Sequence, residues 1–181
     1  MQEPVLGRKR ESGFAGRREG AQTKLPEVFL HPGQNHIATS PAILKMILGS
    51  CAGVFFFDRV LAIGAATHFM LPRHEAGGPS PRYGDVAIAE LLAKLRALGS
   101  AHIEAKVFGG ASILSGLRDL HGKGFDHVGQ KNVQTSLQIL EQEGIPITDK
   151  NVLGDLARKI SMVSDTGEIT LDFVGTEDGN R

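Results

Sequence analysis

Cys51 is the only cysteine of the chain and the first candidate for chemistry. It follows Leu48-Gly49-Ser50, where an apolar run typical of a strand meets a glycine and a small hydroxyl residue. A strand that runs into a tight turn can expose a side chain at the rim of a sheet, and glycine permits conformations that aim amide N–H groups at a developing oxyanion. We therefore interpret Cys51 as a candidate nucleophile, with Gly49 and Ser50 as candidate contributors to an oxyanion site. The alternative is a small apolar core residue, because cysteine is among the most buried residue types.

A nucleophilic thiol needs a base, and His68 is the best placed histidine for this role. It lies inside the apolar run 63–70, and the turn at Asp58-Arg59 predicts that this run forms a β-hairpin with the run that follows Cys51. Such a hairpin would bring Cys51 and His68 together near one end of its ladder. A neutral imidazole there would take the thiol proton, and the resulting ion pair would lower the pKa of the thiol. The alternative is a core histidine whose ring is satisfied by a backbone carbonyl.

A second irregular segment, Gly109-Gly110-Ala111-Ser112, offers backbone amides that could join the same site or cradle an anion. Its spacing matches neither a P-loop nor a dinucleotide fingerprint, which favours a tight turn after a strand. We keep Gly109 and Gly110 as candidate residues of a site loop. No spacing of His, Cys, Asp or Glu resembles a metal-ligand signature, so we predict no metal site.

The elements that must position these residues are predicted from short apolar runs rich in Val, Ile and Phe, separated by Gly, Pro and Asp. The predicted strands span residues 27–30, 36–39, 43–48, 53–57, 63–70, 103–108, 145–148, 159–163 and 169–174, the last two as a hairpin. One amphipathic helix is predicted from Asp85, as its N-cap, to the stop at Gly99, and a second over 128–143 before Gly144. This content predicts an α+β fold, a mixed α/β layered sandwich in which at least two amphipathic helices cover a predominantly antiparallel or mixed sheet.

Length and composition fit a single globular domain, with 181 residues, 41% of them hydrophobic. The formal charge of zero gives no overall field that attracts nucleic acid or anionic lipid, so neither is a predicted partner. No apolar run is long enough to span a bilayer and no secretory signal is visible, so we expect a cytoplasmic protein without direct membrane insertion. Residues 1–24 predict a disordered basic tail, residues 25–175 a single domain and residues 176–181 a flexible C-terminus.

Five segments of the chain stand out together, in the order LGSCAGVFFFD, ATHFMLP, RYGDVAIAELLAKLRALG, EAKVFGGAS and GQKNV. They resemble the CheD family, the chemoreceptor glutamine deamidases of bacterial and archaeal chemotaxis, over most of residues 27–174. The resemblance implies that Cys51 is the nucleophile and His68 the general base. It implies hydrolysis of glutamine side chains on the cytoplasmic helices of chemoreceptors, giving glutamate and ammonia, with no metal and no organic cofactor. It also implies docking to a CheC-type phosphatase as a further partnership.

The chain departs from the family pattern at two places. Family members described as having a catalytic triad carry a threonine six residues before the cysteine, where this chain has Lys45. The ammonium of Lys45 could favour a thiolate or repel an imidazolium, so the third catalytic residue is left unassigned. The family's glycine- and arginine-rich stretch stands here as VLGDLAR, residues 152–158. Lys45 motivates an alternative function, a catalytically weak or inactive binding module that docks to receptors or to a CheC-type phosphatase. A thiol amidase or peptidase acting on other substrates is a third hypothesis.

Overall fold

The computed structural model describes residues 24–75, 77–112 and 126–174, and within them the chain forms nine strands and two helices. The strands are β1 (Glu27–Phe29), β2 (Gln34–Ala38), β3 (Ile43–Leu48), β4 (Ala52–Asp58), β5 (Ile63–Phe69), β6 (Ile103–Gly109), β7 (Ile147–Val152), β8 (Ala157–Val163) and β9 (Ile169–Val174). The helices are α1 (Gly84–Ala97) and α3 (Asp126–Gln142). None of the described helices combines the length and the apolar character that crossing a membrane requires.

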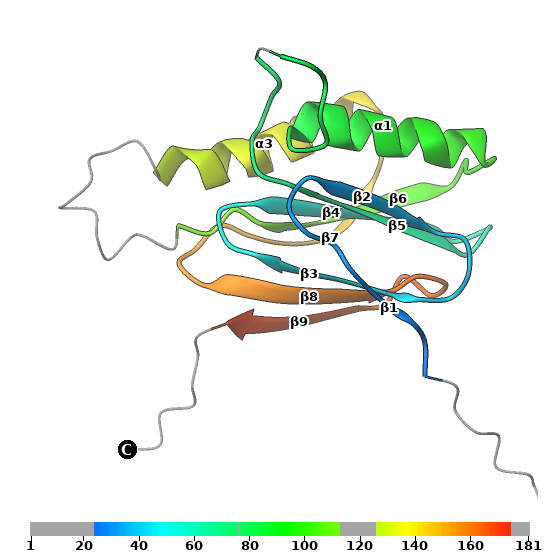
Figure 1. Cartoon of the computed structure of the whole chain (residues 1–181). Coiled ribbons are helices and arrows are strands. Elements are labelled where there is room, and N and C mark those ends of the chain that lie inside the picture. The colour runs from blue at the N-terminus through cyan, green and yellow to red at the C-terminus, as the bar shows by residue number, and fades with distance from the viewer. Residues whose placement is uncertain (1–23, 76, 113–125, 175–181) are drawn as a thin grey trace, which may run out of the picture.

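The strands form two stacked sheets. One has the order β1-β3-β8-β9 and the other the order β2-β5-β4-β6-β7. Each sheet contains one parallel pair, β1 with β3 and β6 with β7, and its other pairs are antiparallel. Figure 1 shows α1 and α3 lying over one face of the five-stranded sheet, with the four-stranded sheet below its other face. The predicted α+β layered fold is therefore confirmed.

β4 is buried along its whole length, because it lies at the centre of the middle layer and both of its faces are covered. Its side chains alternate between two cores. Val54 and Phe56 belong to the core under the helices, whereas Phe55 belongs to the core between the two sheets. This alternation determines which face of the sheet the residues next to the strand occupy.

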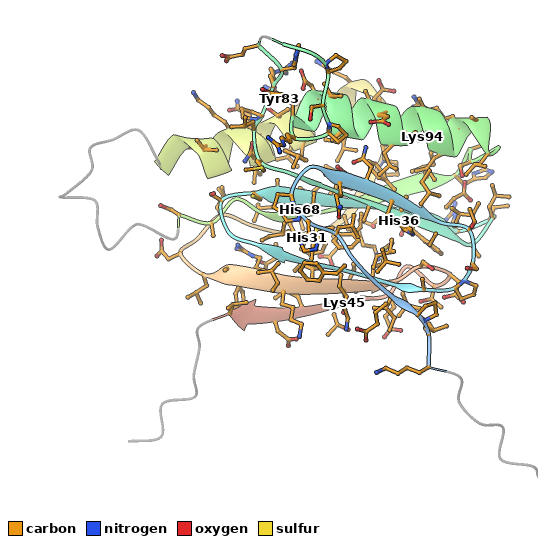
Figure 2. The ribbon with its side chains drawn as sticks, in the orientation of Figure 1. His31, His36, Lys45, His68, Tyr83 and Lys94 are labelled. Carbon is orange, nitrogen blue, oxygen red and sulfur yellow. The ribbon has the colours of Figure 1, made fainter. Side chains whose placement is uncertain are left out.

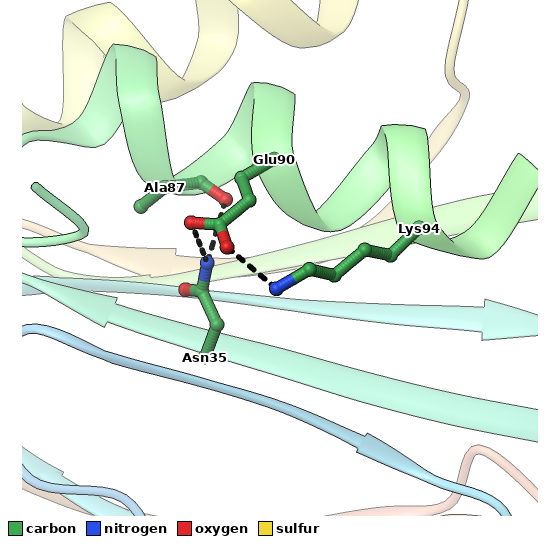
Figure 3. Close-up of polar contacts among 4 residues, drawn as sticks. All are labelled: Asn35, Ala87, Glu90 and Lys94. Atoms are coloured by element: carbon green, nitrogen blue, oxygen red, sulfur yellow. Dashed lines mark hydrogen bonds and ion pairs between the residues drawn. The ribbon is translucent and has the colours of Figure 1, made fainter. Parts of the chain in front are cut away.

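A small polar cluster joins α1 to the edge strand β2 (Figure 3). The side-chain amide of Asn35 donates to the backbone oxygen of Ala87 at 3.2 Å and to the carboxylate of Glu90 at 3.5 Å. Glu90 in turn accepts from Lys94 one helical turn later, at 2.5 Å. These contacts tie α1 to β2, which pairs with β5, the strand that carries His68.

The predicted N-cap of the first helix is wrong. The helix begins at Gly84 with Tyr83 in the N-cap position and no side-chain cap, and the Asp85 carboxylate instead accepts the backbone N–H of His74 at 3.1 Å. A β-carbon on Gly84 would lie 2.6 Å from the Phe69 ring, so this close approach brings the helix start against β5. The C-terminal end is as predicted, with Gly99 following the helix at a φ of 88°.

The strand predicted over residues 145–148 is displaced in the structure. β7 begins at Ile147 and continues through polar residues to Val152, paired in parallel with β6 at the edge of the sheet. Its residues are largely exposed, so it lacks the alternation of apolar and polar residues on which the prediction depended. The predicted tail and C-terminal segment lie, except for Lys24, outside the described residues.

Candidate active site

The register of the β4–β5 hairpin places Cys51 and His68 on the same face of the five-stranded sheet. Ala52 pairs with Phe69, and Gly53 pairs with His68. Cys51 lies two residues before Gly53, and it packs against the core between the sheets, as Phe55 does. Cys51 and His68 are therefore diagonal neighbours at the end of the ladder, and no hydrogen bond joins the thiol to the imidazole among the described residues.

Gly53, the residue between them on this face of β4, has no side chain, and β3 occupies the space. A β-carbon at Gly53 would lie 2.4 Å from the sulfur of Met46 and 3.0 Å from a methyl group of Leu48. The two sheets thus approach each other closely beside the pair. Cys51 itself is half-buried, so its thiol is not sealed inside the core.

His68 has two ring nitrogens in different environments, and together they define its tautomer. The side chain is only 2% exposed, and Nδ1 lies 3.0 Å from the backbone oxygen of Leu30. A carbonyl oxygen only accepts hydrogen bonds, so Nδ1 carries the proton and Nε2 carries the lone pair. Nε2 is buried and has no hydrogen-bond partner among the described residues. The backbone carbonyl expected of a core histidine is present, and it leaves the other nitrogen ready to accept a proton.

Leu30 is a site residue that the sequence did not indicate, because its contribution is a backbone oxygen. Leu30 is 1% exposed, and its own N–H donates to the backbone oxygen of Lys45 at 2.8 Å. The imidazole of His68 is thereby tied through Leu30 to the centre of β3. No sequence pattern marks a carbonyl, since every residue has one.

The side chain of Lys45 points away from the pair. Its neighbours Leu44 and Met46 are fully buried between the sheets, so Lys45 lies on the opposite face of β3. There its ammonium contacts the carboxylate of Glu27 at 2.7 Å, and Figure 2 shows it on the four-stranded sheet, apart from His68. Neither expected effect of its charge on the Cys51–His68 pair therefore applies.

Burial, rather than a neighbouring opposite charge, dominates the titration of both groups. It raises the pKa of the Cys51 thiol above its ordinary value of 9.0, although the N–H of Cys51 itself opposes this shift. Burial also lowers the pKa of His68 below its ordinary value of 6.5. The predicted lowering of the thiol pKa by an ion pair is wrong for this reason. The resting pair is a neutral thiol and a neutral imidazole.

The segment of residues 109–112, here called the glycine loop, supports the backbone around Cys51. The N–H of Gly110 donates to the oxygen of Cys51 and that of Ala111 to the oxygen of Gly49, both at 2.8 Å. Because the Gly110 amide is already engaged, it is not free to bind an oxyanion as predicted. The N–H groups of Ser50 and Cys51, in contrast, donate to no other residue within the described part of the chain, and the N–H of Cys51 faces its own thiol.

Residues 152–158 lie against this loop and are organised by Arg158, which is only 4% exposed. Its guanidinium donates to the Asn151 side chain at 2.6 Å, to the backbone oxygen of Leu156 at 3.1 Å and to that of Leu153. The N–H of Leu153 donates to the oxygen of Gly109 at 2.8 Å. In this chain the single arginine of the stretch therefore has a structural role behind the glycine loop.

Comparison with known proteins identifies the family. A "Probable chemoreceptor glutamine deamidase CheD 1" from Anaeromyxobacter dehalogenans is 37% identical over 143 residues, which cover 78% of this chain and 81% of that protein. The family model described as CheD chemotactic sensory transduction matches residues 70–173. The chain belongs to the CheD family.

Two further comparisons describe the range of the likeness. A "Probable chemoreceptor glutamine deamidase CheD" from Rhodospirillum rubrum is 37% identical over 147 residues, covering 80% of this chain and 81% of the relative. A solved structure, the hypothetical protein YfiH of Bacillus licheniformis, covers 67% of this chain and 51% of its own with a TM-score of 0.43 and 17% identity. The family model begins after Cys51 and His68, so the case for these two residues depends on their own geometry.

Proposed function

We propose that this member of the CheD family is a chemoreceptor glutamine deamidase in which Cys51 is the nucleophile and His68 the general base. The observation that carries the proposal is the environment of His68, whose Nδ1 faces the Leu30 oxygen and whose buried Nε2 has no partner among the described residues. A buried ring nitrogen without a partner lowers the stability of the fold, and a catalytic role would explain why one is kept here. The names of the relatives supply the substrate class, chemoreceptor glutamine.

The first half of the reaction starts from neutral groups. The sulfur of Cys51 attacks the side-chain amide carbon of glutamine while Nε2 of His68 takes the thiol proton. The amide oxygen becomes an oxyanion, which the N–H of Cys51 would bind together with that of Ser50, since neither donates to another described residue. The imidazolium then gives its proton to the leaving nitrogen, ammonia departs and a thioester remains.

The second half returns the enzyme to its starting state. Neutral His68 takes a proton from water as the water oxygen attacks the thioester carbon. The carbon–sulfur bond breaks, the sulfur regains its proton from His68 and a glutamate side chain is released. No step needs a group beyond these residues and water. Throughout, the Leu30 carbonyl keeps the Nδ1 proton in place and stabilises the imidazolium when it forms.

The proposal extends to the surroundings of the reaction. The substrate would be the cytoplasmic helices of chemoreceptors, which places the reaction in the cytoplasm, and docking to a CheC-type phosphatase stays a prediction. The binding-only alternative rests on Lys45, which stands where the family pattern has threonine. The charge of Lys45 adds nothing to it, because that side chain pairs with Glu27 on the far face of β3.

The test is deamidation of receptor cytoplasmic fragments by the purified protein. Ammonia release and the mass change of replacing an amide NH₂ by OH are followed together, and peptide mapping locates the converted glutamines. We expect turnover by the unmodified protein and none by Cys51→Ala or His68→Gln. His36→Gln is the matched control, because His36 lies in the neighbouring strand β2, opposite Ala66 of β5. Turnover retained by Cys51→Ala, or lost equally in His36→Gln, would refute the assignment.

A further inference from the structure

Three consecutive carbonyl groups around the nucleophile are held by three different donors. The oxygen of Gly49 accepts from Ala111 and that of Cys51 from Gly110, both in the glycine loop and both at 2.8 Å. The oxygen between them, that of Ser50, accepts from the side-chain amide of Asn132 in α3 at 3.0 Å. Asn132 is therefore the one side chain, among the described residues, that fixes the peptide joining Ser50 to Cys51.

Asn132 reaches this position because α3 lies unusually close to the glycine loop. A β-carbon on Gly129, one turn earlier, would stand 2.7 Å from the oxygen of Gly110. With no side chain between helix and loop, Asn132 is fully buried, and its amide also donates to the oxygen of Met70 at 2.9 Å. Both partners are acceptors, so the orientation of the amide is fixed by chemistry. Asn132 thus bridges the chain just before Cys51 and the chain just after His68.

The geometry of the peptide bond gives this contact a catalytic consequence. In a trans peptide the C=O of one residue and the N–H of the next point in opposite directions. Holding the Ser50 oxygen toward α3 therefore turns the N–H of Cys51 away from α3, where it faces its own thiol and donates to no other described residue. We propose that Asn132 is a positioning residue that aims the Cys51 N–H as the oxyanion donor of the reaction. This inference rests on the proposed function and adds to it the residue that orients the oxyanion site.

The side chain carries a cost that its two donated hydrogen bonds must offset. The Oδ1 atom of Asn132 is buried and has no partner among the described residues. Leaving such an oxygen unpaired opposes folding, whereas an apolar residue would instead leave the oxygens of Ser50 and Met70 without this donor. In exchange, the amide donates two hydrogen bonds, one to the oxygen of Ser50 beside Cys51 and one to the oxygen of Met70 after His68.

The experiment separates the oxyanion site from the thiol. Asn132→Ala and Asn132→Leu, which keeps the branched shape without the amide, are compared with Ser136→Ala, which removes a buried hydrogen bond of 3.0 Å within the same helix. The probe is a receptor peptide in which a γ-aldehyde replaces the glutamine amide. The thiol adds across its C=O bond, a carbon–sulfur bond forms and the thiol proton moves to the oxygen, which occupies the oxyanion site. Alkylation by iodoacetamide, a displacement at carbon, uses the same thiol without creating an oxyanion.

We expect both Asn132 variants to lose about a hundredfold in kcat and in affinity for the aldehyde, the size of effect seen when one oxyanion donor is lost. The rate of iodoacetamide alkylation and its pH midpoint stay unchanged, and Ser136→Ala retains kcat. The inference is overturned if the aldehyde affinity of both variants is unchanged, if alkylation falls in parallel with it, or if the unmodified protein binds no aldehyde. Aldehyde binding that depends on Asn132, without turnover of any receptor fragment by the unmodified protein, would refute the proposed function and leave this inference standing.

Discussion

Replacing Gly109 by alanine should inactivate the site through the backbone of Cys51. Gly109 ends β6 opposite Ala52 and adopts a φ of 103°, a region that side chains rarely occupy. A β-carbon there would lie 2.3 Å from the backbone oxygen of Cys51. Gly99 provides a matched control, because its φ of 88° is comparable and a β-carbon would meet nothing within 4 Å. The two substitutions share the backbone strain and differ in the collision.

The magnitude follows from these distances. Both variants incur strain of roughly 1–2 kcal/mol from the left-handed conformation. In Gly109→Ala the Cys51 carbonyl must also move from 2.3 Å to the 3.4 Å at which ordinary contact begins. This overpacking adds about 1–3 kcal/mol to the loss of stability. A displacement of about 1 Å at a reacting group can cost about a hundredfold in rate, so kcat should fall by that factor in Gly109→Ala alone.

The assay measures ammonia release at saturating receptor fragment and thermal unfolding of the same preparations. Unfolding identifies the temperature at which each variant is fully folded, and kcat is compared there. We expect Gly99→Ala to retain the activity of the unmodified protein and Gly109→Ala to lose it while folded. Equal activity of the two variants, or a loss in Gly109→Ala that only follows the unfolded fraction, would refute the role of Gly109 in supporting Cys51.

Three further predictions concern the titration of His68 and the charge of Lys45. Burial lowers the pKa of His68, so its neutral form persists below pH 6.5. The acid limb of the profile of kcat against pH should therefore lie below that value. An acid limb above pH 6.5 would contradict this prediction. The same shift means that the unfolded state binds the proton more tightly, so the free energy of unfolding should fall as pH drops below 6.5, less steeply in His68→Gln. Lys45→Met should leave kcat unchanged, since the ammonium faces Glu27, and a loss comparable to that of His68→Gln would show that position 45 acts on the pair.

The hairpin that carries the candidate site was predictable because its signals are local. The run after Cys51 and the run containing His68 are apolar and strand-like, and Asp58-Arg59 marks the turn between them. β7 was poorly predicted because it is an exposed edge strand whose pairing with β6, rather than a pattern in its own residues, makes it a strand. The helix start was misplaced because the close contact of Gly84 with Phe69, distant in sequence, overrides the capping preference of Asp85.

At the site, the sequence indicated side chains and could not indicate backbone atoms. Cys51 and His68 were predicted from residue type and spacing, and the register places them on one face. The direction of the thiol pKa was wrong, because desolvation depends on packing that no single motif encodes. Asn132 lies within GQKNV, one of the five segments that resemble the family. Its role could not be predicted, because its contacts with Ser50 and Met70 exist only in the folded chain.

Lys45, where the chain departs from the expected threonine, leaves the geometry of the proposed base His68 intact. Lys45 faces outward, so its side chain cannot orient the imidazole, whatever its charge. Its backbone oxygen, however, accepts the N–H of Leu30, and the Leu30 oxygen faces Nδ1 of His68. Any residue at position 45 that keeps β3 in place preserves both hydrogen bonds, because neither uses a side chain of that strand. The tautomer that leaves Nε2 free to act as a base is therefore set by the main chain.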